Sequence, residues 1–191
     1  RDSAGLQVFV TNHGLPNQAL KGSRFSDPVL RSGATRNLGD HVSFVYKNAA
    51  EIGELGDNSN ALRTAIRSDE LLHQALAGSS SEVVVLGHTR WASVGVISEP
   101  NAHPLDSQES DNDNRSYVAA VLNGDIDNYA DLIDLHNLDI AAEITTDAKI
   151  VPTLVSRKLA TGSENIEAFR TTVSTFEGSM AIASHCTNEP H

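Results

Sequence analysis

Hydrophobic and polar positions alternate along the chain in two periods, one typical of strands and one typical of helices. Leu6, Val8 and Val10 share one face of a predicted half-buried strand. The run from Val83 to Leu86 is the most apolar in the chain and predicts a strand buried on both faces. In all, the pattern predicts strands at residues 6–11, 42–46, 83–86, 118–122 and 180–183.

Apolar side chains at helical spacing predict further elements between these strands. One helix follows the start residues 57–59 and ends at Gly78, although residues 68–70 could equally open a separate second helix. Pro152 lies beyond the first turn of another helix and removes a backbone donor, so that helix should bend or begin later. The predicted helices cover residues 57–76, 126–136, 147–155 and 163–176.

The order of these elements predicts the fold class. Single strands return between the helices without the steady alternation of a doubly wound parallel sheet. This order favours an α+β fold in which helices cover antiparallel sheets. Residues 12–40 are rich in Gly, Pro, Asn, Ser and Arg and have no periodicity, which predicts a long surface excursion with one short element near Val29 and Leu30.

The charge balance narrows the class of partner. The chain of 191 residues has 14 basic and 25 acidic side chains, a formal net charge of -11 and no Lys- or Arg-rich run. Nucleic acids and anionic membranes attract clustered positive charge, so neither is an expected partner. No apolar run approaches the ~20 residues that a membrane span needs.

Cysteine and histidine positions argue against a disulfide framework, a metal or a cofactor. Cys186 is the only cysteine, which predicts a reducing, cytoplasmic setting. The eight histidines lack metal-ligand spacing, and no nucleophile elbow or phosphate loop occurs. Residues 111–114 resemble a calcium loop only superficially, because the glycine and the distal glutamate of such a loop are missing, and they predict a solvated loop.

The first candidate functional segment is residues 87–95. This polar stretch is bounded by glycines and predicts a bend after the apolar run at 83–86. This bend would place Arg90 and Trp91 at the end of a strand. The planar guanidinium of Arg90 matches two carboxylate oxygens at once. Alternatively, Arg90 braces the loop by bonding backbone carbonyls, and Trp91 is an ordinary core residue.

Two further positions could line the same pocket if the strands that precede Arg90 and Asn123 are neighbours running the same way. Asn123 and Gly124 fit an oxyanion hole, since an amide side chain and the next backbone N–H can both point at one oxygen. In isolation the Asn-Gly step signals a plain turn more often. Asp147, in the first turn of a helix, could bind an ammonium group or merely complement the helix dipole. Together these residues describe a receptor for an amino acid.

Five motifs occur in a recognisable order. They are Asp-Ser-Ala-Gly at 2–5, Gly-His-Thr-Arg-Trp-Ala at 87–92, Asn-Ala-His-Pro at 101–104, Asn-Gly-Asp-Ile-Asp-Asn-Tyr at 123–129 and Thr-Asp at 146–147. In these motifs the chain resembles the glutaminase domain of class II glutamine amidotransferases, which are N-terminal-nucleophile hydrolases. The sequence around Arg90 is most similar to that of one branch of this family. In this branch the glutaminase domain supplies ammonia to a sugar-phosphate (fructose-6-phosphate-like) synthase domain, and the whole enzyme is an aminotransferase of amino-sugar biosynthesis.

The resemblance implies a fold and a set of roles. The fold would be an αββα four-layer sandwich, with two antiparallel sheets between helix layers. Residues 1–191 would be a partial glutaminase domain with a long loop or insertion at about 12–77. The implied roles are Arg90 for the α-carboxylate of L-glutamine, Asp147 for its α-ammonium with Gly124 at the same end, Asn123 and the Gly124 N–H for the oxyanion hole, Trp91 for a gating region and Ser93 for the pocket wall.

The implied reaction needs a nucleophile that residues 1–191 do not supply. An N-terminal cysteine thiolate would attack the side-chain amide of glutamine, release ammonia and form a glutamyl thioester that water hydrolyses. In the family the Asp-Ser-Ala-Gly motif lies downstream of a first strand and helix, so we expect this cysteine upstream of Arg1. Sugar-isomerase domains would follow His191, and the whole protein would be a homo-oligomer. Cys186 follows the last predicted strand and is expected to be an inert thiol.

Some residues depart from the family pattern. Ser93 and Val94 stand where the family usually has Thr-His, which removes one polar contact near the carboxylate, and Asp125 replaces an apolar residue. These departures and the missing nucleophile keep a second hypothesis open, namely a catalytically inactive glutaminase-like domain that binds glutamine or a protein partner.

Overall fold

The computed structural model describes residues 2–50, 56–109 and 115–187. They form two units, the first made of Arg1–Trp91 and Ile97–Pro104 and the second of Ala92–Val96 and Leu105–His191. Each unit contains one antiparallel sheet with helices, so the predicted α+β class is confirmed. The calcium-like stretch 111–114 lies outside the described residues.

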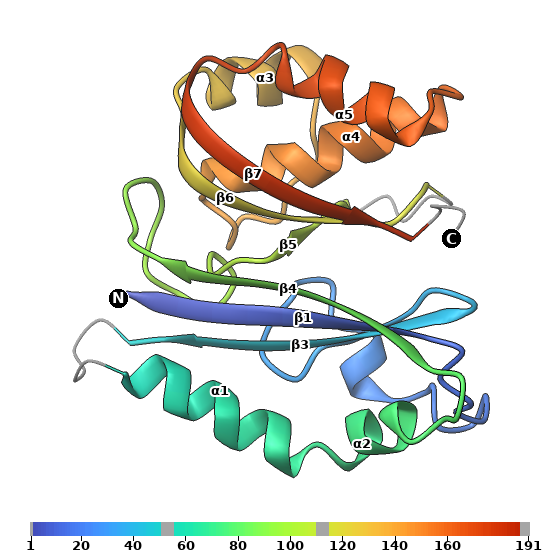
Figure 1. Cartoon of the computed structure of the whole chain (residues 1–191). Helices are drawn as coiled ribbons and strands as arrows, with labels where there is room; N and C mark the ends of the chain where they lie inside the picture. The colour runs from blue at the N-terminus through green and yellow to red at the C-terminus, as the bar shows by residue number, and fades with distance from the viewer. Residues whose placement is uncertain (1, 51–55, 110–114, 188–191) are drawn as a thin grey trace. The chain divides into compact units, whose positions relative to one another are not determined.

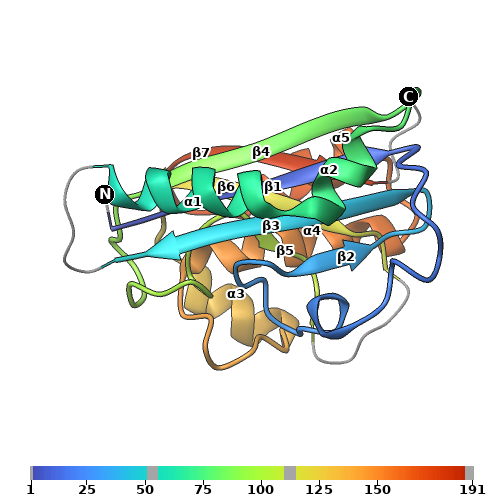
Figure 2. The ribbon, with the colours of Figure 1, turned by 90° about the horizontal axis from the view of Figure 1, so that it is seen from below.

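The first unit is built around a four-stranded sheet in the order β2-β3-β1-β4. The strand β1 pairs antiparallel with both β3 and β4, and α1 and α2 lie along one face (Figures 1 and 2). The predicted strands at 6–11, 42–46 and 83–86 are therefore present, and each is longer than predicted. The elements are β1 (Ser3–Thr11), β2 (Thr35–Asn37), β3 (His41–Ala49), α1 (Asp57–Ser68), α2 (Glu70–Leu76) and β4 (Glu82–Arg90).

The core of the first unit lies between this sheet and the two helices. Phe44 and Tyr46 of β3 are at most 2% exposed and pack with Val10 of β1, Leu62 of α1 and Leu72 of α2. Val42, Phe44 and Tyr46, which alternate along the strand predicted at 42–46, thus share one buried face. Burying each of these side chains is worth about 1.5–3 kcal/mol relative to exposure, which is the main force holding the helices on the sheet.

The excursion at 12–40 contains more buried residues than its composition suggests. Val29 and Leu30 are each 2% exposed, but neither belongs to a helix or strand, so the short element predicted there is wrong. Regular structure appears instead in a 3-10 turn at Ser23–Phe25 and in β2. The wider segment 12–77 also contains β3, α1 and α2. That it is an insertion relative to the family stays a prediction.

The burial predicted for residues 83–86 is wrong. Val83, Val84 and Val85 are 45%, 46% and 56% exposed. They lie in β4, the strand at one edge of the first sheet, and the helix α1 packs on β3 and β1 instead. An apolar run shows that a segment favours a strand, whereas its burial depends on which neighbours the sheet gives it.

Asp69 separates the two helices of the first unit, as the alternative with a second helix proposed. Its carboxylate accepts hydrogen bonds from the backbone N–H groups of Leu71 and Leu72, which caps α2. It also accepts from the Tyr46 hydroxyl at 2.8 Å and from Arg24 in a bidentate pair. Burial alone would raise the pKa of Asp69, but the bonds from Arg24 and Tyr46 outweigh it and lower that pKa.

Asp69→Ala should therefore destabilise the chain. Loss of the cap and of the Arg24 and Tyr46 partners should reduce the free energy of unfolding by about 1–3 kcal/mol. Urea denaturation at pH 7 would measure the change. Asp40 is exposed, so Asp40→Ala is the matched control and should stay within about 0.5 kcal/mol. If Asp69→Ala lowered the free energy of unfolding no more than Asp40→Ala does, the contacts of Asp69 would not stabilise the chain.

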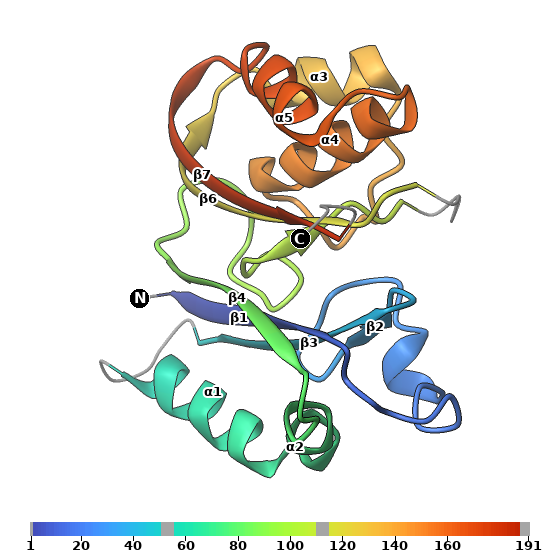
Figure 3. The same cartoon turned by 45° about the vertical axis from the view of Figure 1, so that its right-hand side comes forward.

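The second unit is built around a three-stranded antiparallel sheet in the order β5-β6-β7. Its helices gather on one side of the curved β6–β7 ribbon (Figure 3). Pro152 is the third residue of α4, which a 3-10 turn precedes, so the later helix start predicted from Pro152 is confirmed. The elements are β5 (Leu105–Asp106), β6 (Val118–Ile126), α3 (Tyr129–His136), η2 (Asp147–Lys149), α4 (Ile150–Ala160), α5 (Asn165–Val173) and β7 (Gly178–Cys186).

One buried carboxylate ties three segments of the second unit together. The Glu109 side chain is fully buried and accepts two hydrogen bonds from Arg157 of α4, at 2.8 and 2.6 Å. It also accepts from Arg115 at 2.6 Å and from the backbone N–H of Asp139 at 2.8 Å. The Glu109 carboxylate therefore links α4 to the segments that contain Arg115 and Asp139, which makes it a structural centre of this unit.

Within the part of the chain that the structure describes, no helix is long and apolar enough to cross a membrane.

Candidate functional site

Arg90 and Trp91 stand at the end of β4 in the first unit. The strand continues through the polar residues 87–90, so the predicted bend begins only at Trp91. The backbone carbonyl of Arg90 accepts from the N–H of Asp2 at 3.2 Å, and the Arg90 residue is 4% exposed. Trp91 is 81% exposed, so the alternative that it is ordinary core is wrong. An exposed tryptophan beside a buried arginine is compatible with a ligand site at this strand end.

The Asn-Ala-His-Pro motif packs against the strands that carry two other motifs. His103 is 4% exposed and its ring stacks on His88 of β4, with ring centroids 4.8 Å apart. A Cβ atom added at Gly5 of β1 would overlap the carbonyl oxygen of His103. The glycine of Asp-Ser-Ala-Gly is therefore needed for close approach of the returning segment. Gly5 precedes the strand predicted at 6–11, and only the structure, in which β1 begins at Ser3, shows it to be a glycine inside a strand.

Asn123 and Gly124 lie inside β6, so the alternative that the Asn-Gly step is a plain turn is wrong. They pair with Ala181 and Met180 of β7. Gly124 has a φ of 121°, and a Cβ atom there would overlap the carbonyl oxygen of Ser179 and lie 2.9 Å from the Met180 Cα. The glycine is thus required by the neighbouring strand rather than by a turn.

The direction of the Gly124 N–H follows from the ladder around it. Asp127 donates its N–H to Glu177, on the side of β7. Ile126 donates its N–H at 2.8 Å to the Oδ2 atom of Asp147 instead. Because successive residues of a strand point these groups to alternate edges, Gly124 has the same parity as Ile126. Its N–H is therefore directed to the Asp147 side of β6, beyond the segment that pairs with β5.

Asp147 is a buried carboxylate at the first position of η2. It is 3% exposed, and besides the Ile126 N–H it accepts a hydrogen bond from the Thr146 hydroxyl at 3.2 Å. Burial raises the pKa of Asp147, and the nearby charge of Asp125 raises it further. Among the described residues no Lys, Arg or His forms an ion pair with it. A ligand ammonium group would satisfy this carboxylate.

The loop 92–96 brings Ser93 to the same region of the second unit. The Ser93 hydroxyl is hydrogen-bonded to the Asp125 carboxylate. The backbone N–H of Val96 donates to the Thr145 hydroxyl at 3.1 Å, which fixes the loop beside the residues that precede Asp147. Ser93 and Asp125 are both positions at which the chain departs from the family pattern, and the structure makes them partners.

The predicted site residues are divided between the two units. Ser93, Asn123, Gly124 and Asp147 all belong to the second unit, whereas Arg90 belongs to the first. The shared pocket was predicted on the condition that the strands that precede Arg90 and Asn123 are neighbours, and the structure places these strands in different sheets. Asp125 was not among the predicted site residues, although its place after the Asn-Gly step could have indicated it.

Cys186 and clusters of possible metal ligands are the other groups that could form a reactive centre. Cys186 is buried, and its Sγ atom lies 3.8 Å from the side-chain oxygen of Asn165. Its immediate neighbours include Val118, Val155 and Ala168, so the thiol lies in an apolar setting. Within residues 2–50, 56–109 and 115–187, no group of three His, Cys, Asp or Glu side chains could hold a metal ion.

The fold has a counterpart among solved structures. A structure described as the allosteric regulatory enzyme of purine biosynthesis matches 95% of this chain and 35% of its own, with a TM-score of 0.50 and 15% sequence identity. At that identity the likeness concerns the fold alone. No family model matches the chain.

The motifs and the sequence comparison agree on one class of protein, and the chain belongs to the class II glutamine amidotransferase domains. In sequence it is similar to the glutamine–fructose-6-phosphate aminotransferase (isomerizing) of Sulfolobus acidocaldarius, with 32% identity over 163 residues, 81% of this chain and 27% of that protein. The aminotransferase of the same description from Mesorhizobium japonicum is 42% identical over 99 residues, 51% of this chain and 15% of that protein. The chain therefore spans about a quarter or less of the relatives it matches.

Proposed function

We propose that this chain binds L-glutamine as the glutaminase part of an amidotransferase. The observation that carries the proposal is the Asp147 carboxylate, which is buried, has a raised pKa and lacks a cationic partner among the described residues. Burying an unpaired charge is unfavourable, and folds keep such a group mainly where a ligand completes it. The α-ammonium group of an amino acid is a partner of the right charge.

The remaining roles follow the same ligand. Asn123 and the backbone N–H of Gly124 would stabilise the negative oxygen that develops on the side-chain amide carbon. Ser93 would line the pocket wall, with its hydroxyl held by Asp125. Arg90 would hold the α-carboxylate through two parallel N–H bonds, and the exposed Trp91 would belong to a gating element.

The proposed reaction is hydrolysis of the side-chain amide of glutamine. A cysteine thiolate attacks the amide carbon, ammonia leaves with a proton, and water then cleaves the glutamyl thioester to glutamate and free thiol. Cys186 is unsuited to this role because it is buried among apolar side chains. We propose a cysteine at the N-terminus of the mature protein as the nucleophile and a fructose-6-phosphate-like sugar phosphate as the acceptor of the ammonia, in a cytoplasmic homo-oligomer that also carries sugar-isomerase domains.

The test compares binding and turnover in the full-length protein. Calorimetry with L-glutamine measures binding, and an assay of released ammonia measures hydrolysis. Saturable binding with release of ammonia supports the proposed reaction. Binding without release supports the inactive glutamine-binding domain, for which the departures from the family pattern at Ser93 and Val94 are the favouring observation. Absence of glutamine binding would contradict both.

Arg90→Ala should weaken glutamine binding about 10- to 100-fold, because a charge-assisted bidentate contact worth about 1.5–3 kcal/mol is lost. Calorimetry on the full-length protein would measure this change. Arg63 of α1 is exposed and its guanidinium donates to the side-chain oxygen of its helix neighbour Asn60, so Arg63→Ala is the matched control and should bind normally. Unchanged affinity in Arg90→Ala would refute the role of Arg90.

A further inference from the structure

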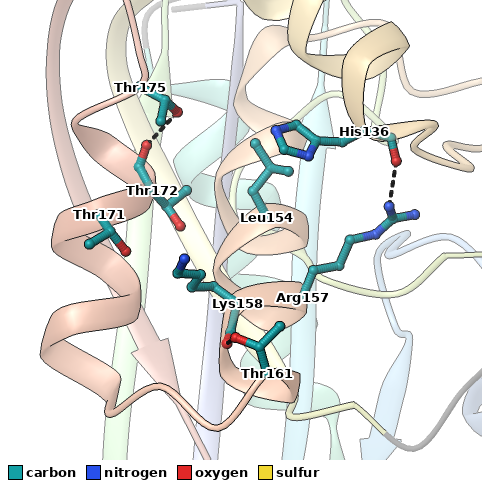
Figure 4. Close-up of a pocket in the computed structure, with 8 residues that line it drawn as sticks. All are labelled: His136, Leu154, Arg157, Lys158, Thr161, Thr171, Thr172 and Thr175. Atoms are coloured by element: carbon teal, nitrogen blue, oxygen red, sulfur yellow. Dashed lines mark hydrogen bonds between the residues drawn. The ribbon is translucent and has the colours of Figure 1, made fainter.

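The second unit contains a cavity of about 270 Å³ that none of the proposed glutamine contacts uses. It lies between α4 and α5, close to the end of α3 (Figure 4). Leu154 and Lys158 line it from α4, Thr172 from α5 and His136 from α3. Its size suits a small molecule, since sites for drug-sized ligands begin at about 300 Å³.

Hydrogen-bond donors converge on this cavity. Figure 4 shows the Lys158 ammonium group directed from α4 toward α5, where the Thr172 hydroxyl faces it, and the His136 imidazole beside Leu154. Within the described part of the chain, the side chains of Lys158, Thr172 and His136 form no hydrogen bond or ion pair with a protein group. Three polar groups therefore border one small space, and their side-chain donors make no hydrogen bond to another protein group.

The charge around the cavity is positive although the chain as a whole is acidic. The lining includes Lys158 and Arg157 and contains no Asp or Glu. Arg157 is paired with Glu109, but Glu109 is shared with Arg115, so one carboxylate faces two guanidinium groups. Lys158 adds a further positive charge. In a chain of net charge -11 this local excess favours an anion.

We propose that this cavity is a binding site for a small phosphate-bearing molecule. A lysine binds phosphate as a point charge, and a hydroxyl and an imidazole N–H supply further donors for its oxygens. The Leu154 side chain offers an apolar contact to the carbon part of a phosphate monoester. The site is separate from the residues assigned to glutamine and does not depend on the proposed function.

Lys158 also has a simpler possible role, stabilisation of the end of α4, and the two roles predict different responses to phosphate. Lys158 lies in the last turn of α4, where a cation also complements the partial negative charge of the helix end. That role requires no ligand and predicts no response to phosphate. A binding site predicts a saturable response that depends on Lys158 and Thr172 together.

The experiment titrates the intact chain with inorganic phosphate and with glycerol phosphate, followed by NMR shifts of the backbone amides at constant ionic strength. We expect saturable shifts in α4 and α5, tighter binding of glycerol phosphate than of inorganic phosphate, and no shifts with glycerol. Lys158→Met should weaken binding about tenfold or more, and Thr172→Val, of nearly the same shape, should weaken it several-fold.

The control and the contrary outcomes are defined by the structure. Lys21 is exposed and lies in the first unit, so Lys21→Met should leave binding unchanged. The proposal is overturned if phosphate and glycerol phosphate produce no saturable shifts in the unchanged chain. It is overturned equally if Lys158→Met, with an unaltered amide spectrum otherwise, binds both anions as tightly as the parent.

Discussion

Glu109→Ala should reduce the free energy of unfolding by about 3–5 kcal/mol, the range measured when one partner of a buried charge pair is removed. The Glu109 side chain is fully buried, and its carboxylate receives hydrogen bonds from Arg157, Arg115 and the backbone N–H of Asp139. Its removal leaves two guanidinium groups without their shared anion and disconnects α4 from the segments on either side. Chemical denaturation at pH 7 would measure the loss.

The exposed pair on α5 provides the control for this substitution. Glu167 and Arg170 are bonded at 2.8 Å, but their side chains are 48% and 71% exposed. Exposed pairs contribute little, so Glu167→Ala should change the free energy of unfolding by less than about 1 kcal/mol. Comparable losses in Glu109→Ala and Glu167→Ala would show that burial of Glu109 has no energetic consequence.

The same carboxylate gives the expected pH dependence. Burial alone would raise the pKa of Glu109, but the hydrogen bonds from Arg157, Asp139 and Arg115 outweigh it and lower that pKa from its usual 4.5. The folded state then binds fewer protons than the unfolded state, so this contribution is complete above pH 4.5 and is lost as the pH falls through the folded pKa. The stability difference between the parent and Glu109→Gln should accordingly shrink below pH 4.5. A difference that grows in acid would contradict this assignment.

Asp147→Asn should separate binding from stability, and this is the second large effect that we expect. Loss of the charge that faces the α-ammonium should weaken glutamine binding by about 2–5 kcal/mol, roughly 30-fold to several-thousand-fold. The free energy of unfolding at pH 7 should stay within about 1 kcal/mol of the parent or rise. Calorimetry with glutamine and denaturation of the same samples would measure the two quantities.

The physical reason is the raised pKa of Asp147, which burial and then the charge of Asp125 produce. A carboxyl whose folded pKa is raised binds more protons folded than unfolded, so its stabilising effect is present at low pH and is lost as the pH rises through the folded pKa. Asparagine resembles the neutral acid. Its amide oxygen can accept from the Ile126 N–H, and its amide group can donate to the Thr146 hydroxyl.

Asp134 of α3 is exposed and supplies the matched change of charge. Asp134→Asn should leave both glutamine binding and stability unchanged. If Asp147→Asn binds glutamine like the parent, the assignment of Asp147 to the ammonium group is wrong. If it unfolds the chain instead, Asp147 is a structural residue that holds η2 against β6.

The partnership of Ser93 and Asp125 bears on the choice between an active and an inactive domain. Both residues depart from the family pattern, and the structure shows that their side chains are hydrogen-bonded to each other. Their hydrogen bond orients the Asp125 carboxylate while keeping it near Asp147. A negative group at this position strengthens attraction for a ligand ammonium. The two changes therefore favour retained amino-acid binding, which is the part of the function common to both hypotheses.

The sequence by itself determined the elements and the family. Spacing of two and of 3.6 residues indicated the strands and helices, because that periodicity is a local property of the backbone. The order of the five motifs indicated the class II glutamine amidotransferases, which the sequence comparison supports. The sequence also predicted that Arg90 lies at the end of a strand, and the structure confirms this position.

Only the tertiary structure decided what surrounds each element. The valines of β4 are exposed because no strand of the described chain lies beyond that edge, which composition cannot reveal. The Asn-Gly step is strand rather than turn because β7 approaches Gly124 closely enough to exclude a side chain. Asp147 differs from any other helix-start acid because burial and Asp125 raise its pKa. Burial, close approach and charge coupling arise between residues distant in sequence, so no local pattern encodes them.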